Sequence, residues 1–164
     1  GPAFELGVDQ PREPGSEEYL DSEKYQIRVW DRKAPGNLRE LIGRINRIRR
    51  ENVALQSDVP LRFIPVNNEQ LLAYCKGGGT SGNLVVVVVN LDPHHTHQGW
   101  LTLPLQDFGL DPDQNYQMQE LLTGAHYLWR GARNYVELDP RFVPAHIFRL
   151  RRHVRSERDF DYFL

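Results

Sequence analysis

The stretch Leu84-Val85-Val86-Val87-Val88-Val89 decides the fold of this chain, because a run of apolar residues so rich in valine favours a β-strand. No polar residue alternates with the apolar ones, so we expect a central strand that is covered on both faces. Three glycines, residues 77–79, precede the stretch and predict a flexible hairpin tip. The hydrophobic core is therefore expected to form around residues 84–89.

Further short strands are expected on both sides of this stretch. They are separated by clusters of Gly, Pro, Asn and Asp, the residues that favour turns. Many short strands with such regular punctuation predict a mainly β protein, an antiparallel β-sandwich. The expected strands cover residues 61–64, 71–76, 84–90, 99–103, 116–122, 127–129, 135–138 and 145–150.

One helix is expected, at about residues 38–50. Asn37 is a good N-cap, and Glu40 stands three residues later as a capping-box partner. Apolar residues recur at helical spacing on one face of the expected helix, and arginines occupy the other face. At a net charge of −2 we interpret the arginines as a solvated face rather than as a nucleic-acid surface. The apolar positions are Leu38, Leu41, Ile42, Ile45 and Ile48.

Residues 1–36 are dense in Gly and Pro, which predicts a long loop rather than long regular elements. The same segment holds many apolar and aromatic side chains, too many for a solvated linker. We therefore expect it to pack against another part of the protein. The aromatic residues of the tail, residues 151–164, likewise suggest that the tail docks.

The composition limits the function classes. The chain has 164 residues, of which 40% are hydrophobic and 26% are charged, as in ordinary globular proteins. A net charge of −2 supplies no field that would attract phosphate backbones or anionic lipid, so nucleic acid and membrane are not expected partners. The single cysteine, Cys75, cannot form an internal disulfide, which fits a reducing cytoplasm.

Familiar catalytic motifs are absent from the sequence. There is no nucleophile elbow, no phosphate-binding loop and no zinc-binding helix of the His-Glu-x-x-His type. His94, His95 and His97 could in principle bind a metal, but no second ligand pair follows at suitable spacing, so exposed histidines are the preferred interpretation. Cys75 lies in an expected strand and is interpreted as a buried, inert thiol.

The loop itself offers candidate groups for chemistry. Glu17, Glu18, Asp21 and Glu23 could supply catalytic carboxylates, although a solvated acidic stretch explains them more simply. Next to them, Lys24 and Tyr25 place a cationic donor beside an aromatic hydroxyl. This combination suits the binding of sugar hydroxyls through hydrogen bonds and ring packing.

Several segments carry a family resemblance. The expected helix, residues 49–55 (Arg-Arg-Glu-Asn-Val-Ala-Leu) and residues 88–91 (Val-Val-Asn-Leu) resemble the end of the barrel and the following β-sandwich, domain C, of α-amylase-type enzymes. The opening residues 1–6, residues 18–28 (Glu-Tyr-Leu-Asp-Ser-Glu-Lys-Tyr-Gln-Ile-Arg) and residues 134–138 resemble the bacterial maltosyltransferases of the GlgE type. The resemblance runs from one end of the chain to the other.

The resemblance implies a retaining enzyme that transfers maltose from α-maltose 1-phosphate to the non-reducing end of an α-1,4-glucan and releases phosphate. It implies no metal or organic cofactor, a cytoplasmic location and a homodimeric full-length protein. Residues 1–55 would be the end of the catalytic (β/α)₈ barrel, its last loop and last helix, and residues 56–164 would be domain C. Lys24 and Tyr25 match a pair that holds the maltosyl unit. The family's catalytic carboxylates lie on earlier barrel strands, so this piece alone is expected to be inactive.

Other functions remain open at this point. The sandwich could be a stand-alone carbohydrate-binding or interaction module, with Trp100, Trp129 and Tyr127 as an aromatic platform, or these aromatics could be packed inside the fold. It could also be domain C of another enzyme of the α-amylase family. A third possibility is that the sandwich only braces the barrel and binds no ligand.

Overall fold

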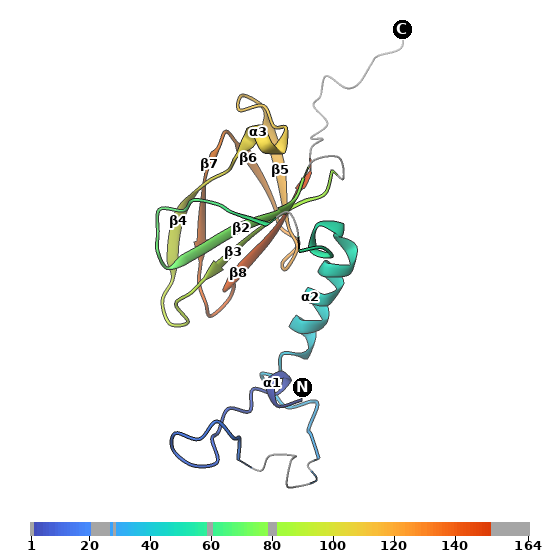
Figure 1. Cartoon of the computed structure of the whole chain (residues 1–164), viewed down its shortest axis with the longest axis vertical. Coiled ribbons are helices and arrows are strands. Elements are labelled where there is room, and N and C mark those ends of the chain that lie inside the picture. The colour runs from blue at the N-terminus through green and yellow to red at the C-terminus, as the bar shows by residue number, and fades with distance from the viewer. Residues whose placement is uncertain (1, 21–26, 28, 59–60, 79–81, 152–164) are drawn as a thin grey trace. The chain divides into compact units, whose positions relative to one another are not determined.

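The computed structural model describes residues 2–20, 27, 29–58, 61–78 and 82–151. The chain forms two compact units, Gly1–Arg47 and Ile48–Leu164. Figure 1 shows the helices and strands of both units. The division of the chain into a barrel end and domain C at residue 55 stays a prediction.

The first unit contains little regular structure, as expected of its Gly- and Pro-rich sequence. A short helix, α1, covers Pro2–Glu5, and an isolated β-bridge joins Pro11 to Tyr19. The long helix α2 covers Arg39–Glu51, so it begins in the first unit and its last four residues belong to the second. Its start agrees with the sequence, because Asn37 Oδ1 accepts a hydrogen bond from the backbone N–H of Arg39 at 3.2 Å.

Strands make up most of the regular secondary structure that is described in the second unit. A short 3₁₀ helix, η1 (Val53–Leu55), leads into it, and a one-turn helix, α3 (Leu105–Phe108), follows the fourth strand. The strands are β1 (Leu61–Phe63), β2 (Leu71–Gly77), β3 (Leu84–Asn90), β4 (His97–Thr102), β5 (Asn115–Glu120), β6 (His126–Arg130), β7 (Arg133–Leu138) and β8 (Ala145–Arg151). All eight expected strands are confirmed, with shifts of at most two residues at their ends.

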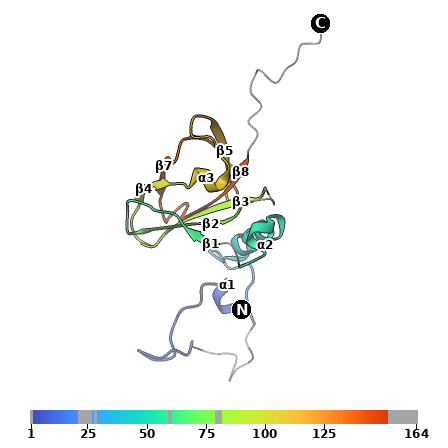
Figure 2. The ribbon, with the colours of Figure 1, turned by 45° about the horizontal axis from the view of Figure 1, so that its top comes forward.

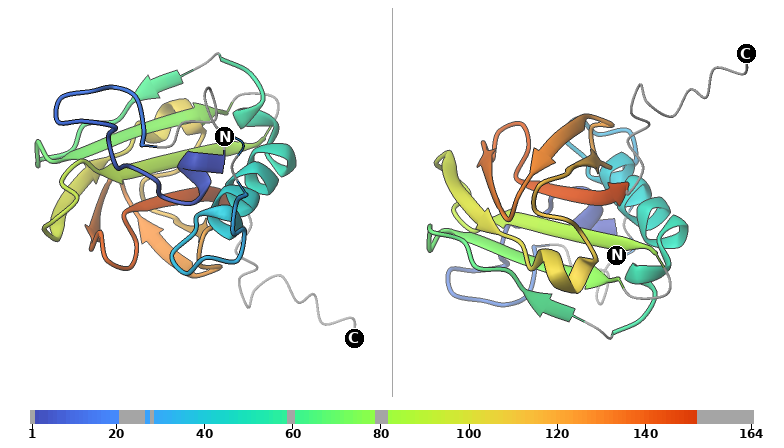
Figure 3. Two further views of the ribbon diagram at one scale, coloured as in Figure 1. Left: turned by 90° about the horizontal axis from the view of Figure 1, so that it is seen from below. Right: turned by 90° about the horizontal axis from the view of Figure 1, so that it is seen from above.

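The strands form two antiparallel sheets, so the predicted β-sandwich is confirmed. Six strands pair in the order β1-β2-β3-β8-β5-β6, and β4 pairs with β7 in the second sheet (Figures 1 and 2). The sequence pattern does not reveal this order, because β8 comes last in the chain yet lies between β3 and β5. Figure 3 shows β3 beside both of its partners, β2 and β8.

The central strand β3 is covered on both faces, as its uninterrupted apolar run predicts. Leu84, Val86 and Val88 point into the space between the sheets. Val85 and Val87 point to the opposite face, where they pack against Ala54 of η1. The polar residue of this strand, Asn90, is buried at its end, where its side-chain amide donates hydrogen bonds to the carbonyls of His95 and Leu138.

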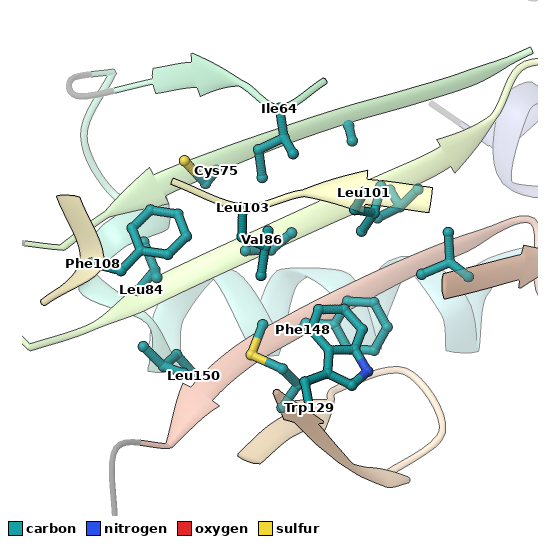
Figure 4. Packing of buried hydrophobic residues seen from close by; sticks show 14 of the residues in the cluster. Ile64, Cys75, Leu84, Val86, Leu101, Leu103, Phe108, Trp129, Phe148 and Leu150 are labelled. Carbon is teal, nitrogen blue, oxygen red and sulfur yellow. The ribbon is translucent and has the colours of Figure 1, made fainter. Parts of the chain in front are cut away.

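The main core fills the space between the two sheets (Figure 4). Within it, the rings of Trp129 and Phe148 pack against each other with centroids 5.0 Å apart. Cys75 and Ile64 lie on the same side of the core near Leu103 in Figure 4. The buried members of this cluster are Ile64, Leu71, Ala73, Cys75, Leu84, Val86, Val88, Leu101, Leu103, Leu105, Phe108, Tyr116, Met118, Trp129, Val136, Leu138, Phe148 and Leu150.

Candidate functional site

The two residues expected to bind substrate, Lys24 and Tyr25, lie outside the described residues, as do Asp21 and Glu23. The segment before them is described and is tightly folded. Its two sides are joined by the bridge between Pro11 and Tyr19 and by a 2.9 Å hydrogen bond from the Leu20 N–H to the Gln10 carbonyl. The backbone that leads to residue 21 is therefore held by hydrogen bonds of this hairpin.

The loop carboxylates that the structure describes fit a solvated acidic stretch better than a catalytic role. Glu17 is exposed. Glu18 forms an ion pair with Arg12 at 3.3 Å, and its backbone N–H is bonded to Ser16 Oγ at 3.1 Å. These contacts close the hairpin, and neither carboxylate is buried.

Several apolar side chains of the first unit are exposed within it. Ile27 and Val29 are almost fully exposed, and Phe4 is 68% exposed. On α2, Leu41 and Ile45 are also exposed, whereas Ile48, which belongs to the second unit, is buried. Exposed apolar surface of this kind marks a face that another part of a protein covers. The expectation that the loop packs against something accordingly stays a prediction.

A polar pocket of about 500 Å³ lies at the beginning of α2. Three cations line it, which together with the helix N-terminus would favour an anion. However, the Arg39 guanidinium already donates to the Arg32 carbonyl at 3.1 Å, and the Asn37 amide donates to the Ala34 carbonyl at 2.6 Å. These hydrogen bonds stabilise the turn that precedes α2. The lining residues are Arg32, Lys33, Asn37, Arg39 and Glu40.

The histidine-rich loop is organised by one carboxylate, Asp92. Its Oδ2 lies 2.8 Å from His95 Nδ1 and 3.1 Å from His97 Nε2, while its Oδ1 accepts the backbone N–H groups of His94 and His95. The hydrogen bonds from His94, His97 and His95 hold the pKa of Asp92 well below its usual range. Within the described ranges, no group of three or more His, Cys, Asp or Glu side chains is placed to hold a metal ion. The loop is thus a hydrogen-bonded turn.

Cys75 has the surroundings expected of an inert thiol. It is 1% exposed and belongs to the main core. Burial raises its pKa, and the nearby Asp107 adds to this, although Arg62 acts in the opposite direction. A thiol that stays protonated is a poor nucleophile.

The three aromatic residues considered for a sugar platform do not come together. Trp129 is buried in the core between Tyr116 and Phe148. Tyr127 is partly exposed but packs against Phe148 on the large sheet, with ring centroids 5.6 Å apart. Trp100 belongs to the other sheet and is 41% exposed. The platform as a group of three is therefore not present.

Instead, Trp100 has a neighbour that sequence reasoning missed. Tyr135 lies directly opposite it on β7, with the two ring centroids 5.5 Å apart and 44% of Tyr135 exposed. The signal was present in the alternation of β7, since Tyr135 and Glu137 flank the apolar Val136. What the alternation does not reveal is that β7 pairs with β4 in this register.

Comparisons with known proteins give a consistent result. A family model described as "GLGE, C-terminal" matches residues 63–150. The α-1,4-glucan:maltose-1-phosphate maltosyltransferase of Methylacidiphilum infernorum is 47% identical over 92% of this chain. The proteins of the same name from Chlorobaculum tepidum and Salinibacter ruber are 43% and 45% identical over 92% and 96% of it. The chain spans only 22–23% of the length of these relatives.

A solved structure supports the fold. The α-amylase of Geobacillus thermoleovorans, solved in complex with acarbose, matches 77% of this chain with a TM-score of 0.56 and 16% identity, over 26% of its own length. At this identity the match concerns the fold alone. In the described part of the chain, every helix is too short or too polar to span a bilayer.

Proposed function

Because this chain belongs to the family of the GlgE-type α-1,4-glucan:maltose-1-phosphate maltosyltransferases, we propose that it is the C-terminal part of such an enzyme. The enzyme would transfer maltose from α-maltose 1-phosphate to the non-reducing end of an α-1,4-glucan and release phosphate. The observation that carries the proposal is the 43–47% identity to three maltosyltransferases across at least 92% of the chain. A match over at least 92% of the chain has to include most of residues 1–36 as well as the sandwich.

The reaction divides into two displacements at the anomeric carbon. In the first, a carboxylate forms a bond to this carbon while the bond to the phosphate oxygen breaks, and phosphate leaves with the electron pair. In the second, the 4-hydroxyl of the acceptor attacks, its proton passes to a general base, and the carboxylate leaves. Two inversions retain the configuration. We assign these carboxylates to the portion of the enzyme beyond the 22–23% that this chain spans.

The part assigned to this chain is substrate binding by Lys24 and Tyr25. An ammonium group offers three hydrogen-bond donors to sugar hydroxyls, and a tyrosine offers a ring face and a hydroxyl. The order of the elements supports the assignment, because the two residues precede α2, the expected last barrel helix. Loops that follow barrel strands form the active-site face of such enzymes.

The remaining assignments follow from the same proposal. The partners are α-maltose 1-phosphate and α-1,4-glucan, both soluble carbohydrates, and no nucleic acid or membrane. We place the enzyme in the cytoplasm, where a free thiol such as Cys75 stays reduced. The full-length enzyme is proposed to be a homodimer.

The experiment that tests the proposal measures phosphate release from α-maltose 1-phosphate in the presence of maltohexaose. The 164-residue chain is compared with a version extended upstream to the length of the relatives. We expect release by the extended protein and none by the short one. If the extended protein, folded and soluble, releases no phosphate, the proposed function is wrong; activity of the short chain would contradict the absence of catalytic carboxylates from it.

A further inference from the structure

The outer face of the two-stranded sheet carries a row of large polar and aromatic side chains. On β4 and β7, the alternating residues Gly99, Leu101, Asn134, Val136 and Leu138 are buried, and the residues next to them on each strand are exposed. The exposed ones lie opposite one another in three pairs, which are Gln98 with Glu137, Trp100 with Tyr135, and Thr102 with Arg133. We call these six residues the Trp100 patch. From Gln98 to Thr102 it extends about 13 Å along the strand.

Two exposed rings form the centre of the patch. The rings of Trp100 and Tyr135 meet at an interplanar angle of 66°, and the guanidinium of Arg133 lies 5.0 Å from the Trp100 ring centroid. Both rings are more than 40% exposed. Their faces are apolar and their surroundings are polar, the combination that suits a ligand with an apolar ring face and a polar rim.

Hydrogen-bonding groups surround these rings. The Tyr135 hydroxyl lies 2.6 Å from Gln98 Oε1 and 3.1 Å from Glu137 Oε2. Partial burial and the neighbouring Glu137 carboxylate raise the pKa of Tyr135, so its hydroxyl keeps its proton. The Tyr135 hydroxyl has one proton, so it donates a hydrogen bond to only one of these two oxygens at a time. The second acceptor oxygen is thus in place to accept a hydrogen bond from a ligand hydroxyl.

The backbone beneath the patch is hydrogen-bonded on both edges of β4. Asn67 Oδ1 accepts a hydrogen bond from the backbone N–H of Trp100 at 2.7 Å, and the backbone N–H of Thr102 donates to the Pro65 carbonyl at 2.9 Å. These bonds occupy the edge of β4 that does not pair with β7. On its other edge, β4 pairs with β7 over its full length. A site built on such a strand needs little ordering when a ligand binds.

The charges of the patch define the class of ligand. Arg133 and Glu137 carry one charge of each sign, so the patch favours a neutral ligand over an anion. A protein partner would have to bury the Glu137 carboxylate, whereas glutamate is depleted in interface cores. Sugar hydroxyls donate and accept hydrogen bonds, so they can pair with the guanidinium and with the carboxylate alike.

Within the second unit, the patch and η1 lie on opposite sides of the sandwich core. The chain enters this unit at Ile48, and η1 packs against the face of the six-stranded sheet that points away from the sandwich core. The patch lies on the outer face of the sheet formed by β4 and β7 (strands labelled in Figure 2), because its residues alternate along both strands with buried ones. The core of the sandwich therefore separates the patch from η1.

We propose that the Trp100 patch is a second glucan-binding site, which holds a neutral α-1,4-glucan chain on the sandwich through ring packing on Trp100 and Tyr135. The proposal rests on the proposed function, which supplies the polymer as a substrate. A site of this kind would keep a long acceptor near the enzyme and raise the effective concentration of its chain ends. Short acceptors would gain nothing from it.

The binding test uses the full 164-residue chain in native gels that contain glycogen. We expect glycogen to retard the chain, and the variant Trp100→Ala to lose at least about tenfold in affinity, the scale of a lost ring contact. Tyr135→Phe keeps the ring and should lose less, about threefold. The matched control is Phe142→Ala, because Phe142 is 79% exposed and has Arg141 5.7 Å from its ring centroid but belongs to neither strand of the patch.

The binding test requires folded variants, and specific results would overturn the proposal. Near-UV circular dichroism and the melting temperature establish that each variant is folded, and Tyr135→Phe serves if Trp100→Ala does not fold. No retardation of the folded wild-type chain, or equal retardation of wild type, Trp100→Ala and Tyr135→Phe, would overturn the proposal. A change from dimer to monomer in Trp100→Ala, measured by light scattering without any glucan effect, would assign the patch to a second copy instead.

A kinetic test in the upstream-extended protein separates this proposal from the proposed function. We expect Trp100→Ala to lower kcat/KM about tenfold with glycogen as acceptor and to leave it unchanged with maltohexaose. A lower kcat/KM of Trp100→Ala with both glycogen and maltohexaose would contradict a binding site remote from the active site. Absence of phosphate release from the wild-type protein with either acceptor would defeat the proposed function, while the glycogen gels would still decide whether the patch binds glucan.

Discussion

The Nδ1 atom of His146 lies 3.9 Å from Oε1 of Glu120, and both side chains are buried. Glu120 is fully buried at the end of β5 and accepts hydrogen bonds from the N–H groups of Leu122, Thr123 and Ile147 and from the Thr123 hydroxyl. One carboxylate thereby ties the turn after β5 to β8. Of the buried side-chain polar atoms in the described ranges, His146 Nδ1 is the one without a hydrogen-bond partner.

Replacing Glu120 by Gln should destabilise the sandwich by about 3 kcal/mol, because an amide has one acceptor oxygen and would leave buried donors unpaired. Urea unfolding followed by tryptophan fluorescence measures the change. Glu69→Gln is the control, since Glu69 is exposed and its replacement should stay within about 0.5 kcal/mol of the wild type. Equal stability of Glu120→Gln and wild type would contradict the assigned role.

The stability of the chain should fall in acid, and Glu120 gives the reason. Burial by itself would raise the pKa of Glu120, but the nearby His146 and the hydrogen bonds from Thr123, Ile147 and Leu122 outweigh burial and lower it to about 2. A lowered pKa contributes stability above the ordinary value of 4.5, and that contribution is lost as the pH falls from about 5 towards 2.

The matching measurement compares the wild-type chain with Glu120→Gln across pH. The stability gap between them should be largest near neutral pH and should narrow below about pH 4. A gap that stays constant down to pH 3 would show that the carboxylate is not the group responsible.

Gly77, at the end of β2, should not tolerate a side chain. Its φ is +85°, and a Cβ atom there would overlap the Asn83 carbonyl oxygen and the Ala54 Cβ. We expect Gly77→Ala to cost more than about 2 kcal/mol. Gly109 also has a positive φ, +63°, but has open space around it, so Gly109→Ala should cost only about 1 kcal/mol. Thermal melts of the two variants give the comparison, and equal losses would contradict the steric explanation.

The thiol of Cys75 should react only when the sandwich opens. It is 1% exposed, and burial raises its pKa, so a disulfide reagent should label the native chain at least about 100 times more slowly than the chain in 6 M guanidinium. Absorbance at 412 nm with 5,5′-dithiobis(2-nitrobenzoic acid) follows the labelling. Rapid labelling of the native chain would contradict the burial of this side chain.

Lys24→Ala in the upstream-extended protein should raise the KM for α-maltose 1-phosphate and lower kcat/KM by roughly ten- to a hundredfold, the scale of one or two lost polar contacts. Lys33→Ala is the control, because Lys33 belongs to the same segment but lines the polar pocket at the start of α2. Phosphate release gives both constants. Unchanged kinetics of Lys24→Ala would remove Lys24 from the substrate site.

The sequence pattern predicted the elements of the second unit well. The apolar run of β3 has one explanation, burial on both faces, and the turn residues separate the other strands clearly. The helices were less predictable. α2 was expected from its cap and its periodicity, whereas α3 is one turn long and has too few residues for a periodic pattern.

The candidate site residues could not be identified from strand and helix patterns alone. Lys24 and Tyr25 were chosen from residue chemistry and family resemblance, and they lie outside the described residues. The aromatic trio failed because Trp129 fills the core, which its neighbours in sequence do not reveal. The sequence did not identify Glu120 either, because one of its hydrogen-bond donors, Ile147, is 27 residues away in the chain.

By itself, then, the sequence determined which segments become strands, which strand is buried on both faces, and which family the protein resembles. These properties follow from local periodicity, turn chemistry and short motifs. Only the tertiary structure decided that β8 inserts between β3 and β5, and that Trp100 faces Tyr135 rather than Trp129 or Tyr127. Strand order and register arise from pairing between distant segments, and no pattern within one segment records its partner.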